Sequence, residues 1–199
     1  DGYLFIFIAL KEAVAILAIP VILIGYKDPK WRYNVTTSSS SYSLGNMITV
    51  GIRTNSNAEK NIKEYKEFTV NIPCQEILNK VEIAGFHPGQ NKIGMADITY
   101  DPGKYVDAPI LDECILSIEC KVEHTVEYGG YTNFIASIKR RVVDESVIDE
   151  EGKLKGVEFN PIYFVGDEYQ RVYRYFNDES RNLGDNIGCS AEDDGPTCG

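Results

Sequence analysis

"SIECKVEHTV", residues 117–126, and "NFIASIKRRVV", residues 133–143, decide the fold. In each stretch apolar side chains recur at alternate positions, as Phe134, Ala136, Ile138 and Val142 do in the second, and charged or hydroxyl side chains lie between most of them. This period of two is typical of half-buried antiparallel strands, and the Gly129-Gly130 pair that separates the stretches predicts a hairpin. His124 falls on the apolar face of the first strand, so we expect it to be a core or interface residue rather than a catalyst.

Shorter segments on either side carry two signals, strand-like runs and helical spacing. The predicted strands are Val21–Tyr26, Tyr33–Ser39, Met47–Arg53, 67–72 and 160–165, and the predicted helices are Asn57–Tyr65 and one from Pro73 to about Val81. An apolar helix is expected ahead of the first strand, and the Gly- and Pro-rich stretch 84–105 is expected to be a long functional loop. This order predicts a mainly β protein, a small β-barrel with short helices added.

The composition fits one globular domain with a proper core. Of the 199 residues 43% are apolar and 25% are charged, so we expect a single domain over residues 1–176 and an acidic, Gly-rich tail over 177–199. The formal charge of -10 argues against nucleic acid as a partner, because phosphate binding needs clustered cations. The apolar N-terminal segments are broken by Lys11, Glu12 and Pro20, so no membrane span is expected.

The numbers and spacing of the cysteines and histidines limit the metal sites and disulfides that can be expected. The five cysteines form no C-x-x-C pair, and only two histidines are present, so a zinc site is not expected. Such usage is typical of reduced thiols, which predicts a cytoplasmic location. Cys114 and Cys120 are expected to be packed thiols.

The segment "NVTTSSSSYS", residues 34–43, carries a hydroxyl group at every position from Thr36 to Ser43. Two interpretations are open. Ser-rich segments are usually solvated connectors. Thr and Tyr favour strands, however, and the run is short, so it could instead be a wall of hydrogen-bond donors facing a polar ligand.

"GIRTNSNAEKNI", residues 51–62, delivers an Arg, hydroxyls and amides to the start of a predicted helix. Together with the free N–H groups of the first helical turn, these side chains would make a phosphate cradle. Ordinary helix capping by Asn or Ser explains the same residues, so both interpretations stay open.

The order and spacing of these pieces resemble the flavin reductase-like family of FMN-binding split barrels, especially its flavoredoxin branch. The matching pieces include "YNVTTSSS", "VGIRTNSNAEKNIKEYKEFTVNIP", "NKIGMADITYDPGKYVDAPILDECILSIECKVEHTVE" and "NPIYFVGDEYQRV", and the match runs over residues 18–172. The resemblance implies an antiparallel Greek-key split barrel, a noncovalently held FMN and a homodimer. It also implies electron transfer from NADH or NADPH to flavin, or onward to another protein.

Position by position, the resemblance also implies contacts to the FMN. Asn34, Thr36, Thr37, Ser38, Ser39, Ser40 and Ser41 would border the isoalloxazine ring. Arg53, Thr54, Asn55, Ser56 and Asn57 would hold the ribityl phosphate. Lys92 would reach the flavin or its phosphate, and Phe164 would pack against the ring.

The chain departs from the family pattern in two places. In the stretch after Asn34, family members often carry a Trp where this chain has only serines, and the run is about two residues shorter than usual. The other place is the hairpin. Tyr131 stands in the hairpin where family members commonly carry a His, which slightly favours a function without NADH or NADPH. The first expectation is an NAD(P)H-dependent FMN oxidoreductase. The alternatives are a flavoredoxin-type electron carrier reduced by a partner protein, and a non-catalytic flavin-binding module. No catalytic side chain is assigned, because flavin supplies the redox chemistry.

Overall fold

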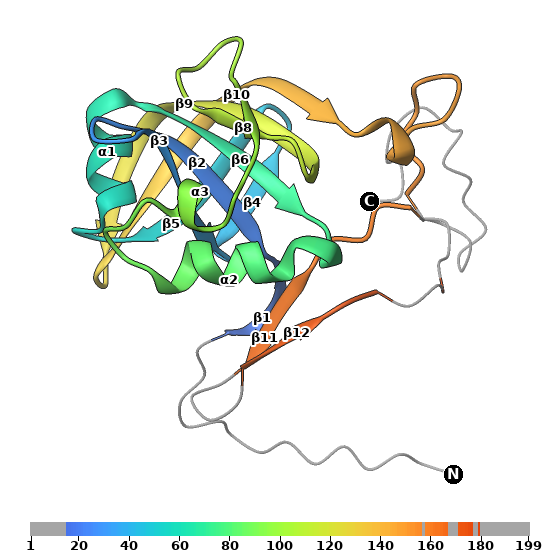
Figure 1. The fold of residues 1–199 in the computed structure, drawn as a ribbon, viewed down its shortest axis with the longest axis horizontal. Helices are drawn as coiled ribbons and strands as arrows, with labels where there is room; N and C mark the ends of the chain where they lie inside the picture. Colours follow the sequence, from blue (N-terminus) through green and yellow to red (C-terminus); the bar gives the residue numbers. More distant parts are fainter. Residues whose placement is uncertain (1–14, 157, 167–170, 177–178, 180–199) are drawn as a thin grey trace, which may run out of the picture.

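The computed structural model describes residues 15–156, 158–166, 171–176 and 179, and its centre is a seven-stranded antiparallel sheet that curls into a barrel (Figure 1). The strands follow the order β3-β2-β6-β9-β10-β5-β4. Their bounds are β2 Ile22–Asp28, β3 Arg32–Ser38, β4 Ser41–Leu44, β5 Met47–Arg53, β6 Glu67–Pro73, β9 Cys114–Tyr128 and β10 Tyr131–Val143. The predicted hairpin is therefore confirmed as β9 and β10.

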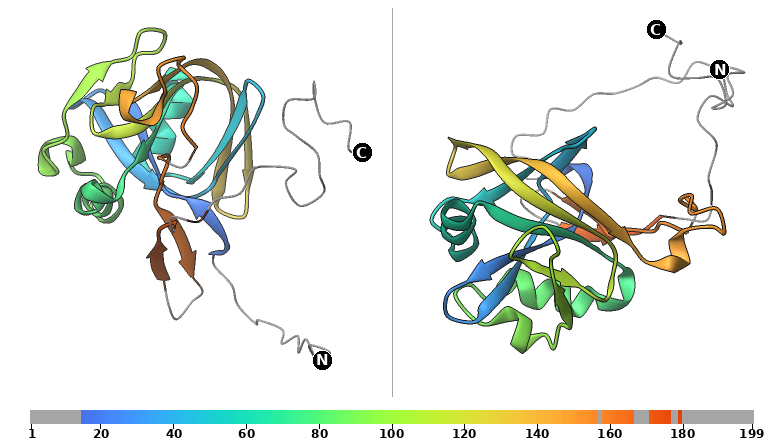
Figure 2. Two further views of the ribbon diagram at one scale, coloured as in Figure 1. Left: turned by 90° about the vertical axis from the view of Figure 1, so that its right-hand side faces the viewer. Right: turned by 90° about the horizontal axis from the view of Figure 1, so that it is seen from above.

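Helices and two smaller sheets surround the barrel. The helices are α1 Asn57–Tyr65, α2 Leu78–Phe86 and α3 Lys92–Met95, with 3-10 turns at Gln75–Ile77 and Glu145–Val147. The small sheets are β7 Tyr100–Pro102 with β8 Pro109–Leu111, and β1 Ala15–Pro20 with β11 Tyr163–Gly166 and β12 Arg171–Arg174. Figures 1 and 2 show that the β1-β11-β12 sheet projects away from the barrel, on the side where α2 lies.

Two hydrophobic cores lie on opposite faces of β2. Inside the barrel, the fully buried Phe68 and Phe134 belong to one cluster with Ile62 of α1. On the outside, Leu23 belongs to a second cluster with Val81 of α2. Because β2 supplies side chains to both clusters, its sequence is apolar without alternation, as in other strands that are buried on both faces.

Asn71 joins four strands from the centre of β6. Its fully buried side-chain amide donates to the carbonyl of Leu23 (3.1 Å) and to Thr69 Oγ1 (3.0 Å). Its Oδ1 accepts from the Leu111 N–H (3.1 Å) and from the Ser117 hydroxyl (2.7 Å). The amide group thus has all the partners that a buried amide requires, and it links β2, β6, β8 and β9.

The β7–β8 segment lies close against β2. Thr69 Oγ1 donates to the carbonyl of Pro109 (2.5 Å), which fixes β8 over the barrel wall. A Cβ at Gly25 would lie 2.5 Å from Thr69 Oγ1 and 2.8 Å from Pro109 Cγ. Glycine at position 25 is therefore required for this approach of backbone to backbone.

Two helix predictions are corrected by the structure. Residues Ala15–Pro20 form strand β1, paired with β11, where an apolar helix was expected; the residues before them lie outside the described ranges. An uninterrupted apolar run does not by itself distinguish helix from strand. Pro73 ends β6 opposite Cys114 instead of opening a helix, and α2 begins later and reaches Phe86. Proline has no N–H to donate, but at the end of a strand this costs the sheet few of its hydrogen bonds.

A bulge in β9 also excludes a core position for His124, while the expected alternative, an interface position, stays a prediction. The pairing with β10 shifts between Val122, which faces Ala136, and His124, which faces Ile135. Beyond this shift the alternation changes phase, so that His124 is exposed instead of lying in the core. A one-residue shift moves every following side chain to the other face of a strand.

The remaining expectations concern the cysteines, a membrane span, the C-terminal tail and the location of the protein. Cys114 and Cys120 are buried as expected, and burial raises the pKa of both thiols. Within the described part of the chain, no helix is long and apolar enough to cross a membrane. The predicted tail over 177–199 falls almost entirely outside the described residues, and it stays a prediction together with the cytoplasmic location.

Replacing Asn71 with Leu should strongly destabilise the protein. The substitution keeps the branching of the side chain but leaves the Leu111 N–H and the Ser117 hydroxyl buried without their acceptor, which should lower the free energy of unfolding by about 3 kcal/mol or more. Urea titration measures the change. The control is Asn133→Leu, at a half-buried strand position whose amide makes a single 3.5 Å contact. Equal losses in the two variants would contradict the role given to Asn71.

Candidate functional site

A trough of about 740 Å³ opens beside the barrel, between β3, β5, the start of α1 and the end of α2. Its walls contain most of the residues singled out in the sequence. Those are Thr36, Thr37, Ser38, Ser39, Ser40, Arg53, Asn55, Ser56, Asn57, Lys92 and Tyr131. Segments that are up to 95 positions apart in the chain thus meet in one cavity.

The hydroxyl run is both a wall of this trough and a closure of the barrel. It leaves β3, crosses to the other edge of the sheet, and enters β4. At the crossing, Ser38 Oγ donates to the Gly51 carbonyl of β5 (3.0 Å), and the Gly51 N–H donates to the Ser40 carbonyl (2.7 Å). Thr37 Oγ1 donates to the carbonyl of Val81 in α2 (2.6 Å). The run is therefore an ordered strand–crossing–strand segment rather than a floppy linker.

The start of α1 forms a second wall. Ser56 is its N-cap, and Ser56 Oγ accepts from the Glu59 N–H (3.2 Å). The side chain of Asn57 turns back to Asp28 Oδ2 (2.8 Å), so this residue presents its backbone rather than its amide to the trough. In the first turn of a helix the N–H groups have no intrahelical acceptor, which leaves those of Asn57 and Ala58 available to an anion at the trough wall.

Lys92 brings a buried positive charge to the trough. Its side chain is only 6% exposed, and burial lowers its pKa to about 8, although the nearby carboxylate of Asp28 opposes the shift. The backbone of Lys92 is fixed by Asn34, whose Oδ1 accepts the Lys92 N–H (3.1 Å) and whose amide donates to the Gln90 carbonyl (2.9 Å). Lys92 therefore presents a fixed, poorly solvated cation, which suits an anionic ligand.

Three expected residues do not line the trough, and a fourth, Phe164, lines an adjoining pocket. Asn34 is fully buried and holds the 90–92 segment, so it does not border the trough. Thr54 places its hydroxyl 3.0 Å from that of Thr132, away from the trough walls. Ser41 already belongs to β4 and does not line the trough either. In each case the local sequence pattern does not determine the direction in which the side chain points from the backbone.

Phe164 lines a smaller apolar pocket that we call the annex. The annex has a volume of about 180 Å³, and Phe164 and Tyr173 form one side of it, with ring centroids 6.2 Å apart. Phe86, which is 75% exposed, lies at its edge. The annex shares Thr37, Ser38, Ser39 and Gly85 with the trough, so the two cavities adjoin.

Some residues of the trough were missed from the sequence. Gly85, Pro88 and Gly89 line it from the end of α2 and the segment that follows. Gly89 has a φ of 72°, a conformation that favours glycine. The Gly- and Pro-rich composition of this stretch was the available signal, and it had marked the region as functional without identifying these positions.

Comparisons with known proteins agree with this architecture. The model of the family described as "Flavin reductase like domain" matches residues 16–173. An uncharacterized protein of Pyrococcus abyssi is 33% identical over 114 residues, which cover 57% of this chain and 65% of that protein. The match thus spans less than two thirds of the relative's own length.

Two solved structures resemble the chain along nearly its whole length. The flavoredoxin of Desulfovibrio vulgaris (Miyazaki F) has a TM-score of 0.82 at 25% identity, and the match covers 92% of this chain and 100% of that one. A flavoredoxin from Methanosarcina acetivorans has a TM-score of 0.79 at 22% identity, with the same coverage. These likenesses confirm the expected split-barrel fold.

The charge of Lys92 should set the pH dependence of anion binding in the trough. Below its pKa of about 8 the ammonium is protonated and attracts a phosphate, whereas above this pH the attraction is lost. For FMN as the probe, the dissociation constant should rise about three- to tenfold from about pH 7 to about pH 9.5. Fluorescence titration measures this change. A Lys92→Met variant should lack the step, and a variant with the wild-type profile would contradict the assignment.

Proposed function

The chain belongs to the flavin reductase-like family, and on this premise we propose that it is a flavoprotein that holds FMN in the trough and transfers electrons through it. The observation that carries the proposal is the joining, in one cavity, of an anion-binding end, a strip of hydroxyl groups and an apolar annex. These three chemistries match the phosphate, the polar edge of the isoalloxazine ring and its methylated edge.

The size and the donor set of the trough fit this cofactor. Its volume of about 740 Å³ lies within the range of small-molecule sites, about 300–1,000 Å³. At one end, the α1 N-terminus and Arg53 would hold the phosphate. The hydroxyls of Thr36, Ser38 and Ser39 would offer partners to the ring carbonyls, and Phe164 would contact the apolar edge of the ring from the annex.

When bound, FMN supplies the redox chemistry, and the protein supplies position, electrostatics and access. The hydroxyl dipoles are fixed before the ligand arrives, so they would stabilise negative charge on the ring without reorganising, and the buried Lys92 ammonium would do the same for the phosphate. No described side chain in the trough has to act as an acid or a base. The chain's own contribution is therefore binding and a preorganised field.

We favour an NAD(P)H-dependent oxidoreductase, and an electron carrier is the second candidate. Tyr131, which is 51% exposed at the trough wall, stands where a His was expected from the family resemblance. The formal charge of -10 supports the carrier, because an acidic protein attracts basic redox partners. A non-catalytic flavin-binding module is the third possibility.

The proposal also includes a homodimer. Large apolar side chains remain exposed near the trough, among them Phe86 at the edge of the annex and Tyr128 at the hairpin tip. A second copy could cover them. Sedimentation equilibrium should then give twice the chain mass of 22.3 kDa. A single-chain mass at micromolar concentration would contradict this part of the proposal.

An absorbance spectrum tests the central claim. The purified protein, as isolated or after addition of FMN, should bind one FMN per chain and show a flavin spectrum. Anaerobic bleaching by NADH or NADPH alone would support the oxidoreductase, and bleaching only through a donor protein would support the carrier. A flavin that neither route reduces would support the binding module. A protein that takes up no FMN would overturn all three functions.

A further inference from the structure

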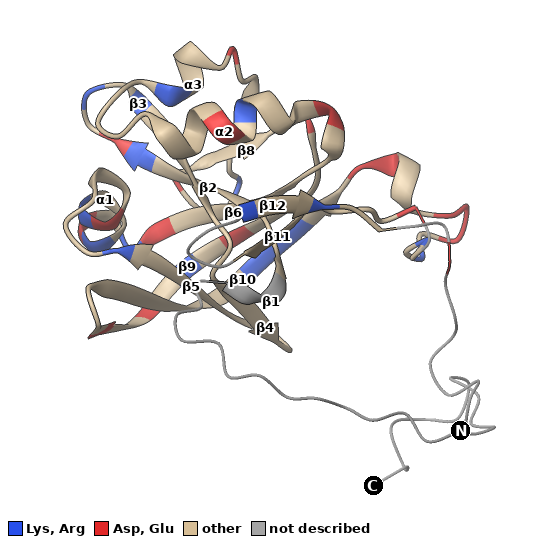
Figure 3. Ribbon diagram, turned by 90° about the horizontal axis from the view of Figure 1, so that it is seen from below, with Lys and Arg blue, Asp and Glu red and all other residues tan. Residues whose placement is uncertain are grey.

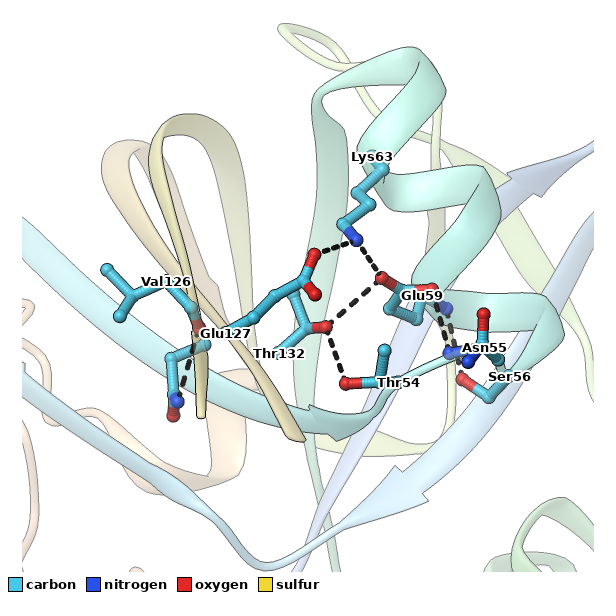
Figure 4. Close-up of polar contacts among 9 residues, drawn as sticks. Thr54, Asn55, Ser56, Glu59, Lys63, Val126, Glu127 and Thr132 are labelled. Carbon is cyan, nitrogen blue, oxygen red and sulfur yellow. Dashed lines mark hydrogen bonds and ion pairs between the residues drawn. The ribbon is translucent and has the colours of Figure 1, made fainter. Parts of the chain in front are cut away.

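Glu59 is a buried carboxylate behind the start of α1. Its side chain is 2% exposed, and Figure 4 shows it between the turn at Asn55 and the β10 strand. It accepts the Asn55 N–H (3.1 Å) at one oxygen and the Thr132 hydroxyl (3.1 Å) at the other. Lys63, one helical turn later, lies 2.5 Å from it. Every polar contact of this carboxylate thus goes to the turn, to the hairpin or to its own helix.

The carboxylate holds a backbone conformation that needs support. Asn55 has a φ of 67°, in the left-handed region, which costs a non-glycine residue free energy unless its surroundings fix it. Glu59 fixes it through the Asn55 N–H. On the other side of the turn, the Thr54 N–H donates to the carbonyl of Gly130 at the hairpin tip (3.0 Å). The turn is therefore held both by the helix and by the hairpin.

The negative charge of Glu59 is balanced by the neighbouring Lys63 ammonium and by hydrogen-bond donors. Burial alone would raise its pKa, but the contacts from Lys63, Thr132 and the Asn55 N–H outweigh burial and keep the pKa below its usual value. Lys63 also pairs with Glu127 of β9 (Figure 4). Figure 3 shows both signs of charge along α1. Without Lys63, a bare carboxylate would lie behind a site for anions and would repel them.

We propose that Glu59 is a positioning residue for phosphate recognition: it holds the Asn55–Ser56 turn and the hairpin together so that the first N–H groups of α1 face the trough. This inference rests on the proposed function, because the phosphate is that of FMN. Glu59 itself makes no contact with the ligand, since it does not line the trough. Its effect is transmitted through the backbone of the turn.

The test compares FMN with riboflavin, which lacks the phosphate. Glu59→Gln keeps the shape, but the amide NH₂ of Gln would face either the Asn55 N–H or the Lys63 ammonium, so that two donors oppose each other. Its dissociation constant for FMN should rise about tenfold, the equivalent of one charged hydrogen bond, while that for riboflavin changes less than about twofold. Lys63→Met, which uncovers the carboxylate, should weaken FMN selectively too, more so at low salt.

Two further variants calibrate this readout. Arg53→Ala removes a cation from the trough wall and sets the size of a phosphate-selective loss. Glu119→Gln is the matched control, because Glu119 is another fully buried carboxylate and accepts the N–H groups of Tyr105 (2.5 Å) and Val106 (3.2 Å) far from the trough lining. It should lower the melting temperature and leave the ratio of the two dissociation constants unchanged.

The outcomes separate this inference from the proposed function. Tighter FMN binding by Glu59→Gln, as simple removal of a negative charge would give, overturns the positioning role. So does an equal loss for FMN and riboflavin, which a merely structural role would produce. A wild-type protein that binds FMN and riboflavin equally well overturns the phosphate site and this inference with it, while the proposed flavin binding stands. If the wild-type protein binds neither flavin, the proposed function itself has failed.

Discussion

The shift of register in the β9–β10 hairpin is the constraint on which the site depends. Up to Val122, β9 places its apolar side chains inside the barrel, and beyond the bulge the phase changes. Glu127 therefore lies on the same face as its cross-strand partner Thr132, and the two contact the Glu59–Lys63 pair of α1. Without this shift, Glu127 would face away from Lys63, and the charged pair of α1 would lose its contact with β9. A single extra residue in β9 thus adds a second polar contact, beside that of Thr132, between the hairpin and the helix that begins at the trough.

The sequence predicted those parts of the fold that local patterns encode. The alternation in the hairpin strands follows directly from one buried and one exposed face, and the bounds of α1 follow from the Ser56 cap. The unbroken apolar run of β2 was also interpreted correctly, although only the structure shows that it serves two cores. The phase change of β9 could not be predicted from the alternation, because it becomes visible only in the pairing with β10, where one residue of β9 has no partner.

In the candidate site, too, some residues could be predicted from local sequence patterns and others could not. The hydroxyl run and the turn before α1 were found because each concentrates its polar groups in one short stretch. Asn34 was placed at the ring by the family resemblance, yet its amide is used entirely inside the protein. Glu59 was not singled out, since a Glu three residues after an N-cap Ser is common in helices. Its partner Thr132 comes from another element, and only the folded chain brings the two together.

The trough also lies between the two hydrophobic cores. Its α1 wall belongs to the barrel interior through Ala58, and its α2 wall, with Gly85, belongs to the outer cluster through Ala84. A ligand that spans the trough would therefore connect two packing units that share the β2 wall. Unfolding of either unit would release the ligand, so ligand binding should couple the melting of one core to the melting of the other.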